Sequence, residues 1–418
     1  MFTSTLFNKN IFVYALVYLA FIILTPHFGN PYDTYCWGSW IVYMFGHNLE
    51  NIYHSGSDYP PLYYYILNMY GSLKGSESAI LDNLYQLKYI TFFFEFCSVL
   101  LLFRFIKEEF RVYFFIFIIL NPGFFYNSVI WGQVDGIVAF LLLSSVVLFI
   151  NRKNTFGLLV YLLCLNFKIQ SIIYLPLVCF LLLNNLSDYK GILHSSYVLL
   201  SLVALELLII SPFINSNTTD LLSNAIFNSV DRYPKISMNA YNWWYWIFEE
   251  DPMEVLDTGT WLGRTYKSWG MLLFFVASFF AMLPLFIMTL SNAIHKTKTK
   301  IEHIDVLFLT TALITLVFFF CNTQMHERYS HYALIFLAGY FAVTKNYIPF
   351  LLMSFAYFLN MEDVMQGLHF PHYGILLFNP EFIAAIFLAL IGYLYFLIYK
   401  NHFSLPYTKD TIVRLFKK

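Results

Sequence analysis

The sequence predicts an all-α membrane protein that crosses the bilayer many times. Of its 418 residues, 59% are hydrophobic, 21% are aromatic and only 12% are charged. A soluble domain carries about 25% charged residues, and it cannot bury such a large apolar share. The net charge of −1 offers no basic surface for nucleic acid. Together these values exclude a soluble enzyme, a disordered chain and a coiled coil.

The apolar runs follow one another along the chain, so residues 1–418 are predicted to form a single integral membrane domain. A bilayer core requires about 20 apolar residues per helix, or fewer where neighbours shield it. We expect about 12 spans, with a range of 11 to 13. The first run lacks a small-residue cleavage site and predicts a retained helix. The expected segments are residues 10–26, 86–106, 112–128, 134–150, 155–167, 170–184, 193–214, 267–290, 304–321, 331–344, 347–361 and 381–400.

The positions of the basic residues predict which side of the membrane each connecting loop lies on. With twelve alternating spans, 16 of the 24 Lys and Arg residues fall on one side and the other 8 on the opposite side. The positive-inside rule makes the richer side cytoplasmic, so both termini are expected there. The outer side carries the two longest loops, residues 27–85 and 215–266. A compact chain of this kind is typical of a bacterial inner membrane with a periplasmic site; a lumenal site in the endoplasmic reticulum is the alternative.

The first outer loop carries a carboxylate beside an aromatic stripe. Trp37, Trp40, Ile41 and Met44 follow Asp33 at helical spacing, which predicts a short helix suited to the membrane interface. One interpretation is an aromatic anchor with a charge at its N-terminus. The other is a carboxylate held at the membrane surface for chemistry.

The same loop ends in Asp58-Tyr59-Pro60-Pro61, whose prolines predict an extended turn. Pro122 is expected to kink or break the third segment. Gln133 and Asp135 follow between the third and fourth segments, where they either cap a helical hairpin or belong to a site.

Lys168 and Gln170 lie between the short fifth and sixth segments, in an otherwise apolar run. Lys168 either reaches the outer surface or awaits an anion. The interruption favours a broken-helix site open to the outside, and a re-entrant pair is an alternative for these two segments.

The later outer loops add basic and aromatic residues. Arg232 lies in the second long loop, and Asn242-Trp243 belongs to an aromatic run that suits either an interface anchor or a platform for a sugar ring. His326-Glu327-Arg328 stands at a membrane mouth, where ionisable residues are costly and usually functional. A structural Glu–Arg pair is the alternative. An HExxH zinc motif does not fit, because position 330 is Ser.

These elements, in this order, resemble the polytopic glycosyltransferases of the GT-C class. They are Asp33 with Trp37 and Trp40, then Tyr-Pro-Pro, WGQVD, KIQ, NAYNWW and MHERY, within residues 30–345. The chain is similar to bacterial homologues of mannosyltransferase II of GPI-anchor synthesis. The resemblance implies a GT-C-like helical bundle with interfacial helices in its first outer loop. It also implies a polyprenyl-phosphate donor of mannose or glucose, with Asp33 as the catalytic base.

The residues agree with an inverting hexosyl transfer to a glycan, glycolipid or protein hydroxyl. A carboxylate takes the proton of the attacking hydroxyl, and outer cations stabilise the departing phosphate. Without a second acidic pair beside the first-loop Asp, we expect a metal-independent enzyme with no cofactor. Expected phosphate ligands are Lys168, Arg232, His326 and Arg328. Expected sugar-binding residues are Trp37, Asp58, Tyr59, Gln133, Asp135, Gln170, Asn242, Trp243 and Glu327.

Two other functions compete with this hypothesis. A lipid-linked sugar flippase or transporter predicts inverted repeats and paired broken helices, but the sequence has no visible repeat and one broken pair, around Lys168. A membrane acyltransferase would use His326, yet its acyl-CoA comes from the cytoplasm and His326 is expected outside.

Overall fold

The computed structural model describes residues 10–185, 191–214, 218–227, 232–295, 303–370 and 375–402. These residues are mostly helical. The α-helices are α1 (Ile11–Leu24), α2 (Pro31–His47), α3 (Pro61–Lys74), α4 (Glu77–Asp82), α5 (Leu87–Leu102), α6 (Arg111–Ile119), α7 (Pro122–Phe125), α8 (Asp135–Ile150), α9 (Asn154–Phe167), α10 (Leu175–Asn185), α11 (Gly191–Ile210), α12 (Thr219–Phe227), α13 (Tyr266–His295), α14 (Ile304–Cys321), α15 (Tyr332–Thr344), α16 (Ile348–Met365) and α17 (Pro380–His402).

Shorter elements join these helices. The π-helical turn η6 and the 3-10 helix η7 lie at helix junctions, whereas the 3-10 helix η10 and two small sheets lie in the loops. Their bounds are Tyr126–Trp131 for η6, Ile169–Tyr174 for η7 and Trp243–Trp246 for η10. Strand β1 (Ser237–Met238) pairs in parallel with β4 (Met325–His326), and β2 (Thr260–Trp261) pairs antiparallel with β3 (Arg264–Thr265).

Six of the described helices are long and apolar enough to cross a membrane, and a pair bent by 65° would make a seventh. Five shorter apolar helices accompany them, and every one of these helices coincides with a segment expected from the sequence. The prediction of an all-α membrane protein is therefore confirmed. The six are Leu84–Phe105, Ser196–Phe213, Tyr266–Leu290, Ile304–Cys321, Ile348–Met365 and Pro380–Lys400.

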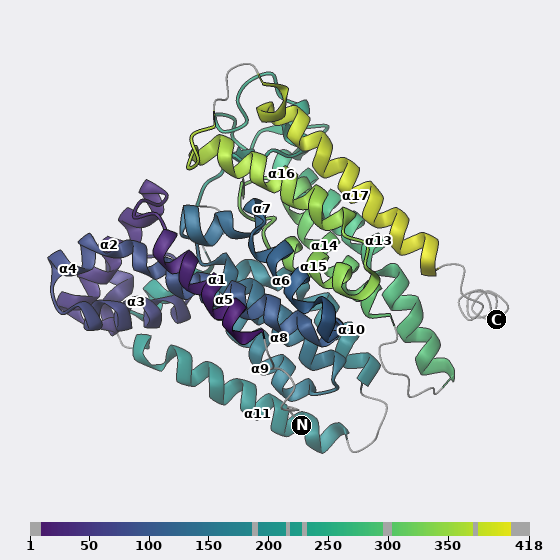
Figure 1. Ribbon diagram of the computed structural model, residues 1–418, viewed down its shortest axis with the longest axis horizontal. Helices are drawn as coiled ribbons and strands as arrows, with labels where there is room; N and C mark the ends of the chain where they lie inside the picture. The colour runs from purple at the N-terminus through teal and green to yellow at the C-terminus, as the bar shows by residue number, and fades with distance from the viewer. Residues whose placement is uncertain are drawn as a thin grey trace.

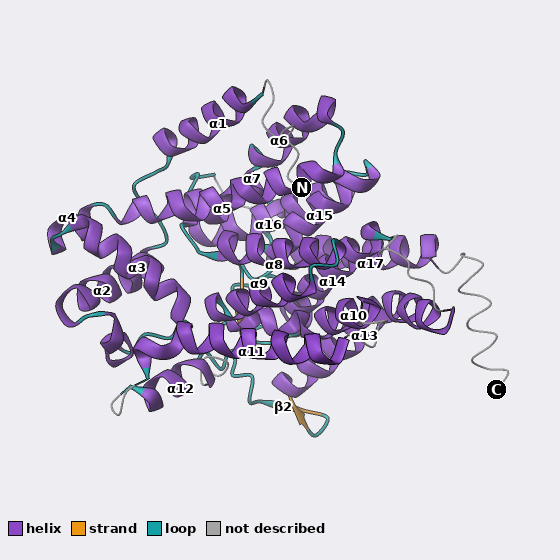
Figure 2. Ribbon diagram, turned by 90° about the horizontal axis from the view of Figure 1, so that it is seen from below, coloured by secondary structure: helices purple, strands orange, loops and turns teal. Residues whose placement is uncertain are grey.

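The core is built around α14, which packs against α13, α15 and α17, while α8 packs against α5, α9 and α15. Helix α14 is apolar on all sides, as expected of a helix surrounded by others. In contrast, α11 exposes much of its apolar surface. It runs along the outside of the bundle, and α1 also lies at the periphery (Figures 1 and 2).

Two helix breaks follow the sequence expectations. The bent pair turns by 65° between Ile119 and Pro122, the first residue of α7. A proline begins a helix readily but cannot continue one, because it lacks the N–H group and clashes with the preceding turn. The second break is at Lys168, whose backbone is extended (φ −155°, ψ 114°) between α9 and η7.

Helices α2, α3 and α4 gather at one end of the molecule (Figures 1 and 2). The predicted aromatic stripe lies on α2, but it faces the protein. Trp37 packs edge-on against Tyr63, and Trp40 packs against Tyr64, both from α3. The expectation of a stripe laid against the interface is thus corrected. The proline-led helix α3 provides a partner surface that a pattern within α2 cannot reveal.

Candidate functional site

A cavity of about 530 Å³ lies between the α2 end of the molecule and the segment that joins α14 to α15. Ten of the fourteen residues expected to form the site line it, although they come from five separate stretches of chain. They are Asp33, Trp37, Asp58, Tyr59, Lys168, Gln170, Arg232, His326, Glu327 and Arg328.

Asp33 is placed by the start of α2. The side chain of Asn30 caps this helix by accepting hydrogen bonds from the backbone N–H groups of Tyr32 and Asp33, both at 3.1 Å. Asn30 and Pro31 are residue types that favour the first turn of a helix. The carboxylate therefore projects from a fixed helix end into the cavity.

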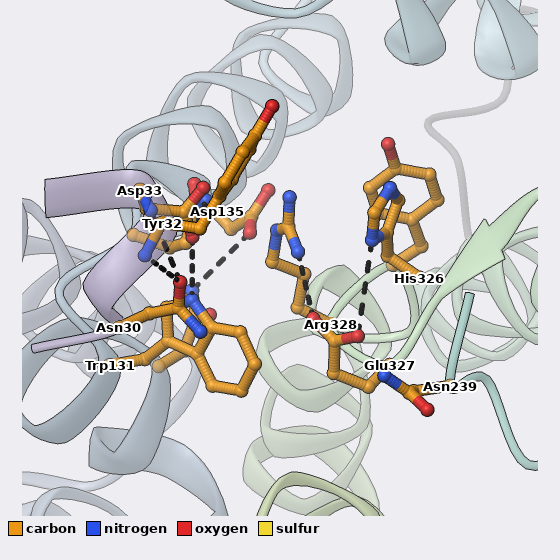
Figure 3. A network of polar contacts seen from close by, with 12 residues as sticks. Asn30, Tyr32, Asp33, Trp131, Asp135, Asn239, His326, Glu327 and Arg328 are labelled. Atoms are coloured by element: carbon orange, nitrogen blue, oxygen red, sulfur yellow. Dashed lines mark hydrogen bonds and ion pairs between the residues drawn. The ribbon is translucent and has the colours of Figure 1, made fainter. Parts of the chain in front are cut away.

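Both donors to the Asp33 carboxylate bind the same oxygen. The indole Nε1 of Trp131 and the amide Nε2 of Gln133 each donate to Oδ2 at 2.7 Å (Figure 3). Among the described residues, no side chain donates to Oδ1. One carboxylate oxygen is thus held in place while the other is left to interact with whatever enters the cavity.

The chain brings Trp131 and Gln133 to Asp33 through an unusual turn. The π-helical η6 is followed by Gly132, which adopts a left-handed conformation (φ 92°) that glycine tolerates. The backbone N–H groups of Gly132 and Gln133 both donate to the Asn127 carbonyl at 2.9 Å. Our expected site omitted Trp131, although its place within the WGQVD run was a signal.

Arg328 stands at the centre of the site, between the Asp33 carboxylate and the Glu327–His326 side (Figure 3). Its Nη1 donates to Glu327 Oε1 at 2.7 Å. The guanidinium lies 5.9 Å from the ring centre of Trp131 and 5.7 Å from that of Tyr329. Burial opposes its charge, but the carboxylates of Asp33 and Glu327 outweigh burial and raise the pKa of Arg328.

Burial in the same site also shifts the pKa values of Glu327 and His326. Burial raises the pKa of Glu327, and the Arg328 charge only partly offsets it. Burial lowers the pKa of His326 well below its usual value, and the nearby Arg328 and Lys168 charges lower it further. His326 Nδ1 lies 3.9 Å from Glu327 Oε2, and the pairing of β4 with β1 holds its backbone.

Lys168 does not reach the outer surface, which corrects that interpretation; it lines the cavity and is paired with a buried carboxylate. Its Nζ lies 2.5 Å from Asp135 Oδ1, and Lys168 is only 5% exposed. The same Asp135 oxygen accepts a hydrogen bond from Tyr332 at 2.9 Å. A buried lysine is stable here because a buried carboxylate neutralises it.

Gln133 and Asp135 are fully buried and do not line the cavity. Of the expected sugar-binding residues, these two therefore contact residues of the cavity wall and not the cavity itself. They lie behind the cavity wall, where Gln133 holds Asp33 and Asp135 neutralises Lys168.

The cavity mouth carries a contact between the two long outer loops. Arg232 Nη1 lies 2.7 Å from Asp58 Oδ2, with side chains 37% and 25% exposed. Beside them, the hydroxyl groups of Tyr32 and Tyr233 lie 3.1 Å apart. Burial raises the pKa of Asp58, although Arg232 lowers it in part.

Asn242 and Trp243, which were also expected to bind the sugar, do not belong to the cavity lining. Asn242 donates to the Phe319 carbonyl at 3.1 Å, and Trp243 Nε1 donates to the Cys321 carbonyl at 3.2 Å. The last turn of a helix leaves carbonyls without partners. The two side chains donate hydrogen bonds to carbonyls at the end of α14. The sequence of the loop alone did not show that these carbonyls needed donors.

One cavity wall is apolar. Ile172 from η7 and Met271 and Phe275 from α13 line it, and these residues are also 51%, 43% and 60% exposed. The wall is therefore continuous with the apolar outer surface of the bundle. Within the described ranges, no group of three or more His, Cys, Asp and Glu residues is suited to hold a metal ion.

The fold and the apolar helices define a multi-pass helical membrane protein with a polar, aromatic-lined cavity. Comparison with known family models and with curated proteins found no match for this chain.

Proposed function

We propose that this protein is an inverting glycosyltransferase of the GT-C type. It moves a hexose, mannose or glucose, from a polyprenyl-phosphate donor to a hydroxyl group of a glycan, glycolipid or protein. The observation that carries this proposal is the Asp33 carboxylate. One of its oxygens is held at 2.7 Å by two N–H donors, and the other is without a donor among the described residues.

This arrangement suits a general base. The acceptor hydroxyl gives its proton to Asp33 Oδ1 as its oxygen bonds to the anomeric carbon. The bond from that carbon to the phosphate oxygen breaks on the opposite side, and the phosphate leaves with the electron pair. Base catalysis of this kind contributes roughly 10²- to 10⁴-fold. The fixed donors on Oδ2 keep the carboxylate oriented without consuming its second oxygen.

The surrounding side chains suit the rest of such a donor. Arg328 lies in the cavity with a raised pKa and provides a permanent positive charge for the phosphate. Arg232, half-exposed at the mouth, is a second cation that a phosphate reaches by replacing Asp58. Lys168 acts less directly, because Asp135 already neutralises it.

Aromatic and apolar side chains complete the fit. The rings of Trp37, Tyr59 and Tyr329 line the cavity and offer faces to the C–H groups of a sugar. The exposed apolar side chains of η7 and α13 provide a surface for a polyprenyl chain that leaves the cavity sideways.

We further propose that the chain spans the membrane twelve times, with both termini in the cytoplasm and the cavity on the periplasmic side of a bacterial inner membrane. Six long helices, one bent pair and five shorter apolar helices support this number. The shorter helices need neighbours that shield their ends from lipid. The excess of basic residues on the opposite loops supports the orientation.

The test is sugar transfer in proteoliposomes that contain a membrane lipid extract. Polyprenyl-phosphate mannose and polyprenyl-phosphate glucose, each radiolabelled, are supplied in parallel. We expect Asp33→Asn to reduce transfer by about 10²- to 10⁴-fold. The matched control Asp82→Asn, at an exposed position on α4 outside the cavity, should retain full transfer.

Transfer should also persist in EDTA. An Asp33→Asn variant as active as the wild type would contradict the assignment of the base. A folded wild type that transfers neither sugar, but moves the donor across the bilayer, would instead support a lipid-linked sugar flippase.

A further inference from the structure

Lys88 is a buried lysine that the proposed chemistry does not use. It lies at the start of α5, is 4% exposed and does not line the cavity. In the described part of the chain, no carboxylate lies within 4.0 Å of its Nζ. An ammonium group buried without a counter-charge is costly. Its surroundings must therefore offer strong compensation.

Four main-chain carbonyls provide that compensation. Lys88 Nζ donates to Pro26 at 3.2 Å, to Val129 at 2.8 Å, to Ile130 at 3.0 Å, and also to Phe28. Pro26 and Phe28 belong to the segment between α1 and α2, whereas Val129 and Ile130 belong to η6. One ammonium group therefore binds two segments that are about a hundred residues apart in sequence.

These two segments carry the two halves of the Asp33 site. The first continues into Asn30, Pro31 and Asp33, and the second continues into Trp131 and Gln133. A backbone hydrogen bond from Asn30 N to Trp131 O, at 3.0 Å, joins them on the cavity side of Lys88.

Two glycines make room for this junction. A side chain at Gly132 would place its Cβ 3.1 Å from Lys88 Cε, and one at Gly29 would place its Cβ 2.9 Å from Trp131 O. The compact ammonium group directs three donors from a single nitrogen, whereas a guanidinium spreads its five donors over a larger planar fork. The junction is thus shaped for lysine.

We propose that Lys88 is a positioning residue, which holds the backbone of Asp33 at the distance where Trp131 and Gln133 bind its carboxylate. The effect on turnover rests on the proposed function, but the geometric effect does not. Without the Lys88 ammonium group, the four carbonyl oxygens lose their hydrogen-bond donor and repel one another, and water then replaces the donor. The Asn30–Trp131 hydrogen bond is then expected to open.

Hydrogen exchange of the Asn30 amide, resolved to single residues by mass spectrometry, measures the junction directly. We expect Lys88→Met to accelerate it by about 10- to 100-fold, since hydrogen bonds to a charged group are lost. Lys88→Gln, which keeps a neutral donor and disturbs folding less, should give a smaller increase. The control Lys74→Met removes a lysine that bonds to Gln86 outside the cavity, and it should leave Asn30 unchanged.

Sugar transfer provides the second measurement. In the Lys88→Gln variant, kcat should fall at least about tenfold, because the Asp33 carboxylate is displaced. KM for the donor should change little, because the residues that bind the donor stay in place. Adding Lys88→Gln to Asp33→Asn should reduce transfer no further, whereas general unfolding would reduce it again.

Protection of amides in the buried helix α14 reports whether the variants remain folded. Unchanged exchange at Asn30 in folded Lys88→Met would overturn the proposal. Faster exchange in a protein whose wild type transfers no sugar would overturn the proposed function and keep the positioning role.

Discussion

Trp131 illustrates how a single side chain serves the site at the residue scale. Its indole N–H binds Asp33 Oδ2 at 2.7 Å, and its ring lies beside the Arg328 guanidinium. It thus touches both the carboxylate and the central cation. Trp131 orients the carboxylate, while Gln133 provides the same contact from the other side.

We predict that Trp131→Phe lowers kcat for sugar transfer by about tenfold. The substitution keeps an aromatic ring beside Arg328 but removes one charge-assisted hydrogen bond, worth about 1.5–3 kcal/mol. Radiolabelled transfer in proteoliposomes measures the change. Trp243→Phe is the matched control, since it also removes an indole donor, but outside the cavity. Equal rates in the two variants would argue against a role for the Trp131 contact.

At the scale of elements, a buried polar contact joins α5 to the start of α15, and α8 packs closely against α5 beside it. Glu95 on α5 lies 2.9 Å from His331 at the start of α15, and both are almost fully buried. Gly136 on α8 provides the space, because a Cβ there would lie 2.6 Å from Glu95 Cγ. The close approach of these helices therefore depends on one glycine.

We predict that Gly136→Ala destabilises the protein by about 1–3 kcal/mol, as expected when a packed interior receives an extra methyl group. Thermal unfolding in detergent, followed by size-exclusion chromatography, measures this loss. Gly392→Ala on α17 is the matched control, because a Cβ there meets no atom within 4 Å. It should be neutral or slightly stabilising. A Gly136→Ala variant as stable as Gly392→Ala would contradict the tight α5–α8 contact.

At the scale of the whole molecule, the long apolar helices enclose a cavity whose polar residues come mostly from loops and helix ends. In the proposed topology this cavity opens on one side of the membrane, so the orientation of the chain decides which substrates reach it. The proposed orientation puts α3 outside and the turn between α8 and α9 inside.

Cysteine labelling tests this orientation. In a chain freed of its five cysteines, Ser72→Cys on α3 should react with a membrane-impermeant maleimide added to intact cells. Lys153→Cys, after α8, should react only once the membrane is permeabilised. Both positions are exposed in the fold, so accessibility depends on the side of the membrane. The reverse pattern would place the cavity in the cytoplasm.

Local features of the structure could be predicted because they depend on neighbours within a few residues. Apolar runs indicated the helices, Pro122 indicated the bend, and the isolated Lys168 indicated a break. Among the polar and aromatic residues expected to form the site, ten line the cavity. Helix periodicity, the effect of proline and the cost of polar groups in lipid can each be recognised from a short segment of sequence.

The partners of those side chains were decided only by the tertiary structure. Lys168 pairs with Asp135, Asp33 accepts a hydrogen bond from Trp131, and Lys88 donates to four carbonyls. Each contact joins segments that are packed together but far apart in sequence, so no local pattern predicts it. The same packing turns the α2 stripe toward α3. It also assigns Asn242 and Trp243 to the end of α14. Sequence determines which groups must be satisfied, whereas the packing of distant segments determines which group satisfies each one.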